Sequence, residues 1–148
     1  MNVGDQVEDF TLLDQHGEKR SLSEFLATGP VVLFFYPAAM TRGCTMESCH
    51  FRDLAAEFAE VGAHRVGISR DEVDKQRQFA EMHGFDYPLL SDPSGEIAER
   101  FGVRRKLALL PSKRMTFVIS SASRILGVIH SEIAMNGHAD RALELLRR

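Results

Sequence analysis

The stretch PAAMTRGCTMESC at residues 37–49 decides the fold, because it joins a hydrophobic run to a helical pattern. The preceding run, VVLFFY at residues 31–36, is continuously apolar and closed by Pro37, which is typical of a strand buried on both faces of a sheet. From about Cys44, apolar residues recur at spacings of three and four, which predicts a helix. We therefore expect Cys44 in the first helical turn, where free backbone N–H groups and the helix dipole stabilise a thiolate.

The bulk properties of the chain are those of an ordinary globular domain. Its 148 residues are 44% hydrophobic and 26% charged, so we expect one domain over residues 1–148 with its own core. The formal net charge of −3 gives no electrostatic reason to expect nucleic acid or an anionic membrane as a partner. The one basic cluster, RRK at residues 104–106, is short and predicts a solvated loop.

Neither a membrane span nor a signal peptide is visible in the sequence. No segment approaches the ~20 apolar residues of a spanning helix, and the opening residues, MNVGDQ, lack a basic and then apolar pattern. We therefore expect a cytoplasmic protein. In that compartment two cysteines close in sequence are more often catalytic or metal-binding than structural.

Strand and helix patterns alternate along the first two thirds of the chain. Strands are expected at residues 10–13, 31–36, 65–69, 87–91, 115–119 and 125–129, and helices at residues 21–26, 44–61, 71–83, 96–101 and 139–146. The segment SLSE at residues 21–24 is a capping box, and the last two strands predict a hairpin. Within the helix at 71–83 we expect Val73, Phe79 and Met82 to be buried. Residues 103–113 predict an irregular loop or a short extended segment.

This order of elements indicates an α/β fold with a mixed central β-sheet flanked by helices. It suits a thioredoxin-like fold with inserted elements, while the pattern alone leaves another three-layer arrangement open.

The spacing of the two cysteines limits what they can do. A C-x4-C pair without a second ligand cluster is a poor zinc site, so we expect no metal. Five residues along an intact helix rotate roughly 140° and rise roughly 7.5 Å, whereas a disulfide needs α-carbons within about 7 Å. If Cys44 and Cys49 react with each other, the first turns of the helix must unwind. The alternative is that both cysteines act as small hydrophobic core residues.

The cysteine segment also carries a family resemblance. The spacing of Pro37, Thr41 and Cys44 matches the P-x-x-x-T-x-x-C signature of peroxiredoxins, and Cys49 stands where the Q-type (bacterioferritin comigratory protein) subfamily places a resolving cysteine. Further matches in the family's order are FFYP at 34–37, Glu47, FRD at 51–53, VGIS at 66–69, PLLSDP at 88–93, R-x-TFVI at 114–119 and GHA at 137–139. The chain resembles an atypical two-cysteine peroxiredoxin over nearly its whole length.

The resemblance implies a thiol-dependent peroxidase. Cys44 would be the peroxidatic nucleophile, whose thiolate attacks a peroxide oxygen and becomes a sulfenic acid. Cys49 would resolve it as an intramolecular disulfide, which thioredoxin or a similar dithiol reductant reduces. Hydrogen peroxide and small organic hydroperoxides are the implied substrates, and no cofactor is needed because cysteine is the redox group. We expect a monomer, with a dimer as the alternative.

The resemblance also assigns supporting roles. Arg114 would stabilise the thiolate and polarise the peroxide, with a surface arginine as the alternative. Thr41 would hydrogen-bond the peroxide and the sulfur, or else serve only the helix entry. Pro37 would shield the sulfur, and it also ends the strand. Glu47 would support Arg114 or the helix entry rather than react, because a carboxylate acting as a base beside the sulfur opposes thiolate formation.

Other residues are interpreted more simply. The scattered histidines predict turn, surface or packing roles, and they are His16, His64, His83, His130 and His138. Arg42 replaces a proline that is common in the family, and we expect its charge to favour the thiolate while the loop becomes more mobile. Two rival functions stay open, a thiol–disulfide oxidoreductase without peroxidase activity and a non-catalytic redox sensor.

Overall fold

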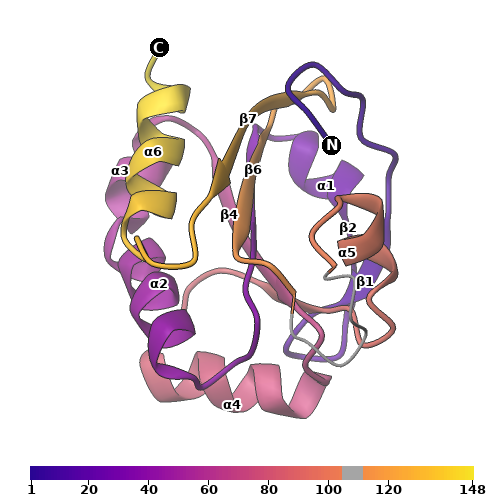
Figure 1. The fold of residues 1–148 in the computed structure, drawn as a ribbon, viewed down its shortest axis with the longest axis vertical. Helices are drawn as coiled ribbons and strands as arrows, with labels where there is room; N and C mark the ends of the chain where they lie inside the picture. Colours follow the sequence, from indigo (N-terminus) through magenta and orange to yellow (C-terminus); the bar gives the residue numbers. More distant parts are fainter. Residues whose placement is uncertain (105–111) are drawn as a thin grey trace.

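A seven-stranded mixed sheet forms the centre of the computed structural model, which describes residues 1–104 and 112–148 (Figure 1). The strands are β1 Thr11–Leu13, β2 Lys19–Ser21, β3 Val31–Phe35, β4 His64–Ser69, β5 Leu89–Ser91, β6 Met115–Ile119 and β7 Ile125–His130. The helices are α1 Leu22–Leu26, α2 Arg42–Asp53, α3 Ala55–Glu60, α4 Val73–His83, α5 Glu96–Arg100 and α6 Gly137–Leu146. Across the sheet the strands run in the order β2-β1-β5-β4-β3-β6-β7.

Strand β3 is the centre of this sheet. It pairs in parallel with β4 and antiparallel with β6, and the hairpin predicted for β6 and β7 is present. Strand β4 pairs in parallel with β5, and β1 with β2 completes the far edge in antiparallel pairing. The predicted thioredoxin-like fold, with its mixed sheet flanked by helices, is confirmed.

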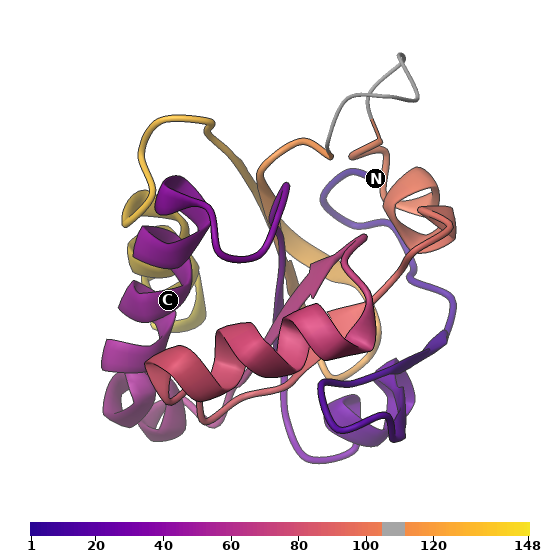
Figure 2. The ribbon, with the colours of Figure 1, turned by 90° about the horizontal axis from the view of Figure 1, so that it is seen from below.

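Two hydrophobic cores lie on opposite faces of the sheet, and residues 31–36 contribute to both. Val31, Leu33 and Phe35 belong to the core under α1 and α5, which we call the α1/α5 core. The alternate residues of the same run pack with α2, α3, α4 and α6, in what we call the α2/α6 core. Figures 1 and 2 show these two groups of helices on either side of the strands. A strand buried on both faces explains the uninterrupted apolar run.

The predicted helix at 44–61 is two helices, so that boundary was wrong. Helix α2 ends at Asp53, and α3 begins at Ala55 after Leu54, whose φ of −96° and ψ of 21° leave the helical range. The Arg65 guanidinium donates to the Phe51 carbonyl at 2.9 Å. That carbonyl would otherwise accept the next helical hydrogen bond, so a contact from a distant strand marks the break.

Helix α4 buries a different stripe from the predicted one. Phe79 is buried as expected, but Val73 is only half-buried and Met82 is 62% exposed. The inward position belongs to Gln76, whose amide donates to the Ser69 hydroxyl and the Leu90 carbonyl, both at 2.9 Å. A polar residue that is satisfied by the sheet does not register in a hydrophobic pattern.

The N-terminal segment forms the edge of the sheet, as expected, although β2 was not predicted. The capping box is present, with the Ser21 N–H donating to Glu24 Oε1 at 3.0 Å. Part of the predicted irregular segment, residues 105–111, lies outside the described residues, together with most of the basic cluster. Arg104 does lie within them, 3.6 Å from Glu99. Among the described helices, none has the length and apolar character needed to cross a membrane.

Candidate active site

The site begins where β3 ends. After Phe35 the chain passes through half-buried Pro37 and a loop, and α2 starts after its N-cap residue Thr41. Met40 in this loop has a φ of 67°, which is a left-handed conformation that few non-glycine residues adopt. Cys44 lies in the first turn of α2, as predicted, and it is fully buried.

Arg114 reaches Cys44 because of strand pairing. It directly precedes β6, and the antiparallel register places Met115 opposite Phe35 at the end of β3. Its Nη2 donates to Cys44 Sγ at 3.3 Å. The two residues are far apart in sequence, so the arrangement depends on the sheet. A buried guanidinium on the sulfur is suited to stabilise negative charge there.

Glu47 lies beside Arg114 on the same face of α2 as Cys44, because residues three apart in a helix are neighbours. Arg114 Nη1 donates to Glu47 Oε1 at 2.8 Å, and the carboxyl is fully buried. Burial raises the pKa of Glu47 to about 8, although Arg114 opposes this. The predicted contact between Glu47 and Arg114 is present, and the guanidinium is shared between a carboxyl and a sulfur.

His138 is the site residue that the sequence analysis missed. It lies in the first turn of α6 and is fully buried. Its Nδ1 is 2.8 Å from Thr116 Oγ1 and 3.5 Å from Glu47 Oε2, while its Nε2 is 2.8 Å from the Ser131 carbonyl. Burial lowers the pKa of this imidazole. The only signal in the sequence was its place in the GHA segment at residues 137–139, which resembles the family.

Among the described residues, neither Thr41 nor Cys49 hydrogen-bonds to Arg114. The exposed Thr41 hydroxyl donates to the Ala38 carbonyl at 2.8 Å, so Thr41 shapes the entry to α2. Cys49 is half-buried, and both cysteines are free thiols. Burial raises the pKa of the Cys49 thiol, with Arg52 opposing the effect.

The segment of α2 around Cys49 contacts three other parts of the chain, namely the connection between α4 and β5, helix α6 and strand β3. The Tyr87 hydroxyl donates to the Ser48 carbonyl at 2.6 Å, and His50 Nε2 is 2.7 Å from Asp140 Oδ1 on α6. Phe51 stacks on Phe34 of β3 with ring centroids 4.1 Å apart. These contacts hold the thiol form of the helix in place.

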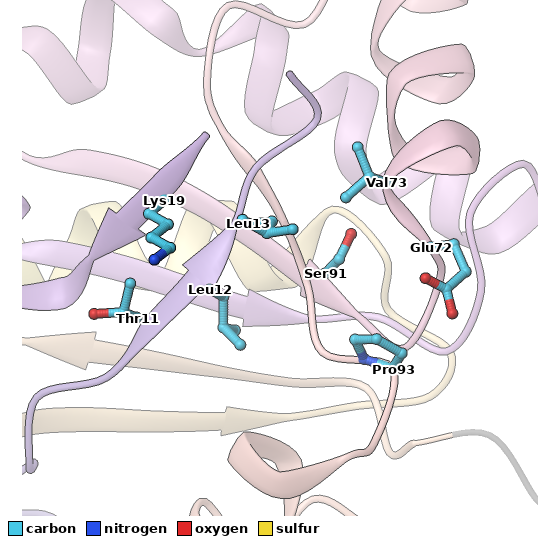
Figure 3. A pocket seen from close by; sticks show the side chains of 8 residues that line it. All are labelled: Thr11, Leu12, Leu13, Lys19, Glu72, Val73, Ser91 and Pro93. Carbon is cyan, nitrogen blue, oxygen red and sulfur yellow. The ribbon is translucent and has the colours of Figure 1, made fainter. Parts of the chain in front are cut away.

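The described residues form no metal centre, and the groove that they form is not lined by the site residues. Within residues 1–104 and 112–148, no group of three or more His, Cys, Asp or Glu side chains could hold a metal ion. A groove of about 770 Å³ lies between strand β1 and the start of α4, with Leu12, Val73 and Pro93 in its lining (Figure 3). None of the predicted site residues lines it, so we do not assign the site to this groove.

Known proteins share this architecture. The sequence profile of the AhpC/TSA family matches residues 3–127. A peroxiredoxin of Mycobacterium tuberculosis is 62% identical over 149 residues, covering 99% of this chain and 97% of that protein. The chloroplastic peroxiredoxin Q of Populus jackii is 36% identical over 147 residues, covering 99% of this chain and 68% of that protein.

Solved structures agree with these relatives. The crystal structure of peroxidoxin BcpB from Mycobacterium tuberculosis superimposes with a TM-score of 0.96 at 62% identity, covering 99% of this chain and 97% of that chain. The bacterioferritin comigratory protein of Xanthomonas campestris, described for its alkyl peroxide reduction activity, gives 0.85 at 30% identity, covering 93% and 90%.

The fold and these relatives define the class of protein, which is a thiol peroxidase with the thioredoxin-like fold of peroxiredoxins. The chain belongs to the AhpC/TSA family, and within it lies close to peroxiredoxin Q and the bacterioferritin comigratory proteins. The family predicted from the cysteine signature is confirmed.

Proposed function

We propose that this peroxiredoxin reduces hydrogen peroxide and small organic hydroperoxides through Cys44, with Cys49 as the resolving thiol and a thioredoxin-type dithiol as the reductant. The observation that carries the proposal is the position of Arg114, whose Nη2 lies 3.3 Å from Cys44 Sγ in a buried site.

In the first step the Cys44 thiolate attacks one oxygen of the peroxide. The new S–O bond forms as the O–O bond breaks, and the departing hydroxide or alkoxide takes up a proton to become water or an alcohol. Cys44 is oxidised to the sulfenic acid. Arg114 offers N–H donors where negative charge moves from the sulfur to the oxygens, which is the electrostatic arrangement that lowers such a barrier.

The loop before α2 completes the site in this proposal. Thr41 presents a hydroxyl at the helix entry, which can turn from the Ala38 carbonyl to the bound peroxide. Pro37 follows the end of β3 and has the proposed role of shielding the sulfur. Glu47 fixes the guanidinium of Arg114 through the 2.8 Å hydrogen bond and does not itself react.

In the second step the Cys49 thiol attacks the sulfur of the sulfenic acid, which releases water and forms the disulfide. Both cysteines lie on the continuous helix α2, five residues apart, so a rise of roughly 7.5 Å has to be removed by unwinding. A dithiol then returns two electrons and restores both thiols. All the redox chemistry takes place on sulfur, so the cycle needs no bound cofactor.

Two alternatives from the sequence remain as outcomes of the test, namely a thiol–disulfide oxidoreductase and a redox sensor. The monomeric state, the single domain and the cytoplasmic location also stay predictions of this proposal.

Peroxide consumption with a thioredoxin system tests the proposal in three proteins, the parent, Cys44→Ser and Cys49→Ser. We expect no consumption by Cys44→Ser, and one equivalent with a trapped sulfenic acid from Cys49→Ser. Equal steady turnover in the parent and Cys49→Ser would contradict resolution by Cys49. One equivalent consumed by the parent, without turnover, would favour the sensor.

A fourth protein, Arg114→Gln, separates the peroxidase from the oxidoreductase. We expect its reaction with peroxide to slow by about 100-fold, because one donor to the developing charge is lost. Reduction of its preformed disulfide by thioredoxin should continue at the parent rate. An oxidoreductase without peroxidase activity would be insensitive to this substitution.

A further inference from the structure

The hydrogen bonds of His138 fix where its proton lies. The Ser131 carbonyl can only accept, so the Nε2 atom that lies 2.8 Å from it must carry a hydrogen. In a neutral imidazole Nδ1 is then an acceptor, and the Thr116 hydroxyl at 2.8 Å is its donor. The ring therefore has no hydrogen to offer Glu47 unless it becomes charged.

Glu47 Oε2 faces that acceptor. It is 3.5 Å from His138 Nδ1, and it is buried without a hydrogen-bond partner among the described residues. The other carboxyl oxygen already accepts from Arg114. Two acceptors that face each other in a fully buried site are unfavourable. A proton on Nδ1 removes the conflict, and so does a proton on Glu47 once the Thr116 hydroxyl turns and leaves the single lone pair of Nδ1 to it.

Charge counting leads to the same conclusion. With a Cys44 thiolate and an ionised Glu47, one guanidinium would face two negative charges in the protein interior. One proton on Glu47 or His138 makes the buried cluster neutral, and the positive charge of Arg114 can then stabilise the Cys44 thiolate.

Three charged or titratable groups outside α2 and α6 lie near the pair of Glu47 and His138. Arg114 approaches from the start of β6 and favours proton loss. Glu132, after β7, favours proton retention, and His130 lies 3.0 Å from it at the surface. Burial acts on both members of the pair, raising the pKa of Glu47 to about 8 and lowering the pKa of His138, and both directions favour the proton on Glu47.

We propose that His138 is a positioning residue which acts through Glu47 on Arg114, and that Glu47 and His138 together hold one proton while Cys44 is a thiolate. The inference rests on the proposed role of Cys44. Loss of this proton gives Arg114 a second anion to neutralise, and the guanidinium is then divided between Glu47 and the sulfur. The rate of the reaction with peroxide should therefore fall at alkaline pH.

The pH profile of sulfenic acid formation tests this pair. The rate is measured by competition with a second peroxidase between pH 6 and 9.5, in a Cys49→Ser background that keeps Cys44 as the single thiol. For the parent residues we expect the rate to fall above pH ~8, as the pair loses its proton. In Glu47→Gln, whose amide imitates the protonated acid, this decline should disappear.

Histidine variants test the positioning role. We expect His138→Leu, which fills the space without polar atoms, to slow the pH 7 reaction by about tenfold or more through misplacement of Arg114. His138→Asn keeps a polar group near the position of Nδ1 and should recover most of the rate. The matched control is His64→Asn, because His64 pairs with Val31 at the opposite end of β3 and is expected to behave like the parent.

The outcomes separate this inference from the proposed function. A parent-like alkaline decline in Glu47→Gln, or a parent-like rate and profile in His138→Leu, would overturn the inference alone. If His138→Leu does not fold, the profile of Glu47→Gln decides. Reaction of Cys44→Ser with peroxide would instead overturn the role of Cys44 itself.

Discussion

Removing one hydroxyl group, in Tyr87→Phe, should speed disulfide formation. Tyr87 is 4% exposed, and its hydroxyl donates to the Ser48 carbonyl at 2.6 Å, directly before Cys49 in the helix. Burial raises the pKa of Tyr87 well above its usual range, so the hydroxyl stays protonated as a donor. The bond therefore stabilises the closed helix and is lost when this part of α2 unwinds.

The magnitude follows from a single hydrogen bond. A net contribution of ~1 kcal/mol corresponds to about a fivefold shift toward the unwound helix. If unwinding precedes attack by Cys49, the disulfide should form about fivefold faster in the variant. Formation of the sulfenic acid should keep its rate, because the Tyr87 hydroxyl donates to the Ser48 carbonyl and, among the described residues, no hydrogen bond joins it to Cys44 or Arg114.

A single pulse of peroxide, followed by rapid alkylation and mass spectrometry, measures both steps. Tyr36→Phe is the matched control, since its buried hydroxyl donates to Gln76 on α4 and not to α2. Both variants should lose ~1 kcal/mol of unfolding free energy, but only Tyr87→Phe should accelerate the disulfide. Equal disulfide rates in the parent and Tyr87→Phe would refute unwinding at Ser48, and so would equal acceleration by the control.

Two further predictions concern stability. The raised pKa of Glu47, about 8 against 4.5 for an ordinary glutamate, means that the folded state keeps a proton which the unfolded state loses. Its contribution to the unfolding free energy is therefore full below pH ~4.5 and is lost as the pH rises through about 8; urea titrations at several pH values should show this slope in the parent and not in Glu47→Gln. Phe51→Ala should cost ~3–5 kcal/mol by urea unfolding, because the ring is fully buried against Phe34. The exposed Met82→Ala should change stability by less than ~0.5 kcal/mol, and comparable losses in the two variants would contradict this packing argument.

Several parts of the fold that depend on hydrophobic pattern were predicted correctly. The apolar run at residues 31–36 is buried on both faces, and the hairpin of β6 and β7 and the last helix lie where periodicity placed them. The position of Cys44 in the first turn of α2 was also predicted, because it follows from where the helix begins.

The errors arose where a tertiary contact overrides local pattern. Helix α2 ends early where Arg65 takes the carbonyl of Phe51, and α4 turns its buried face toward Gln76 because the sheet satisfies that amide. Neither partner is adjacent in sequence, so no window of local sequence contains the cause.

In the active site, too, one contact was predicted and another residue was missed. The pairing of Cys44 with Arg114 was expected from family resemblance, and the register of β3 with β6 supplies its physical reason. His138 was missed because a lone histidine at a helix start is usually a surface residue. Its polar role exists only once α2, β6 and α6 are brought together.

The division of the protein into two cores has a consequence for engineering. In the proposed cycle, unwinding of α2 would disturb the α2/α6 core, where Phe51 packs, whereas the α1/α5 core lies on the opposite face of the sheet. Under that proposal, heat resistance could be raised by repacking around Phe25 or Phe101 without stiffening the segment that is proposed to open in each turnover. Stability and catalytic rate often oppose each other in enzymes. Here the residues that could be repacked for stability lie on one face of the sheet, and the segment proposed to unwind lies on the other.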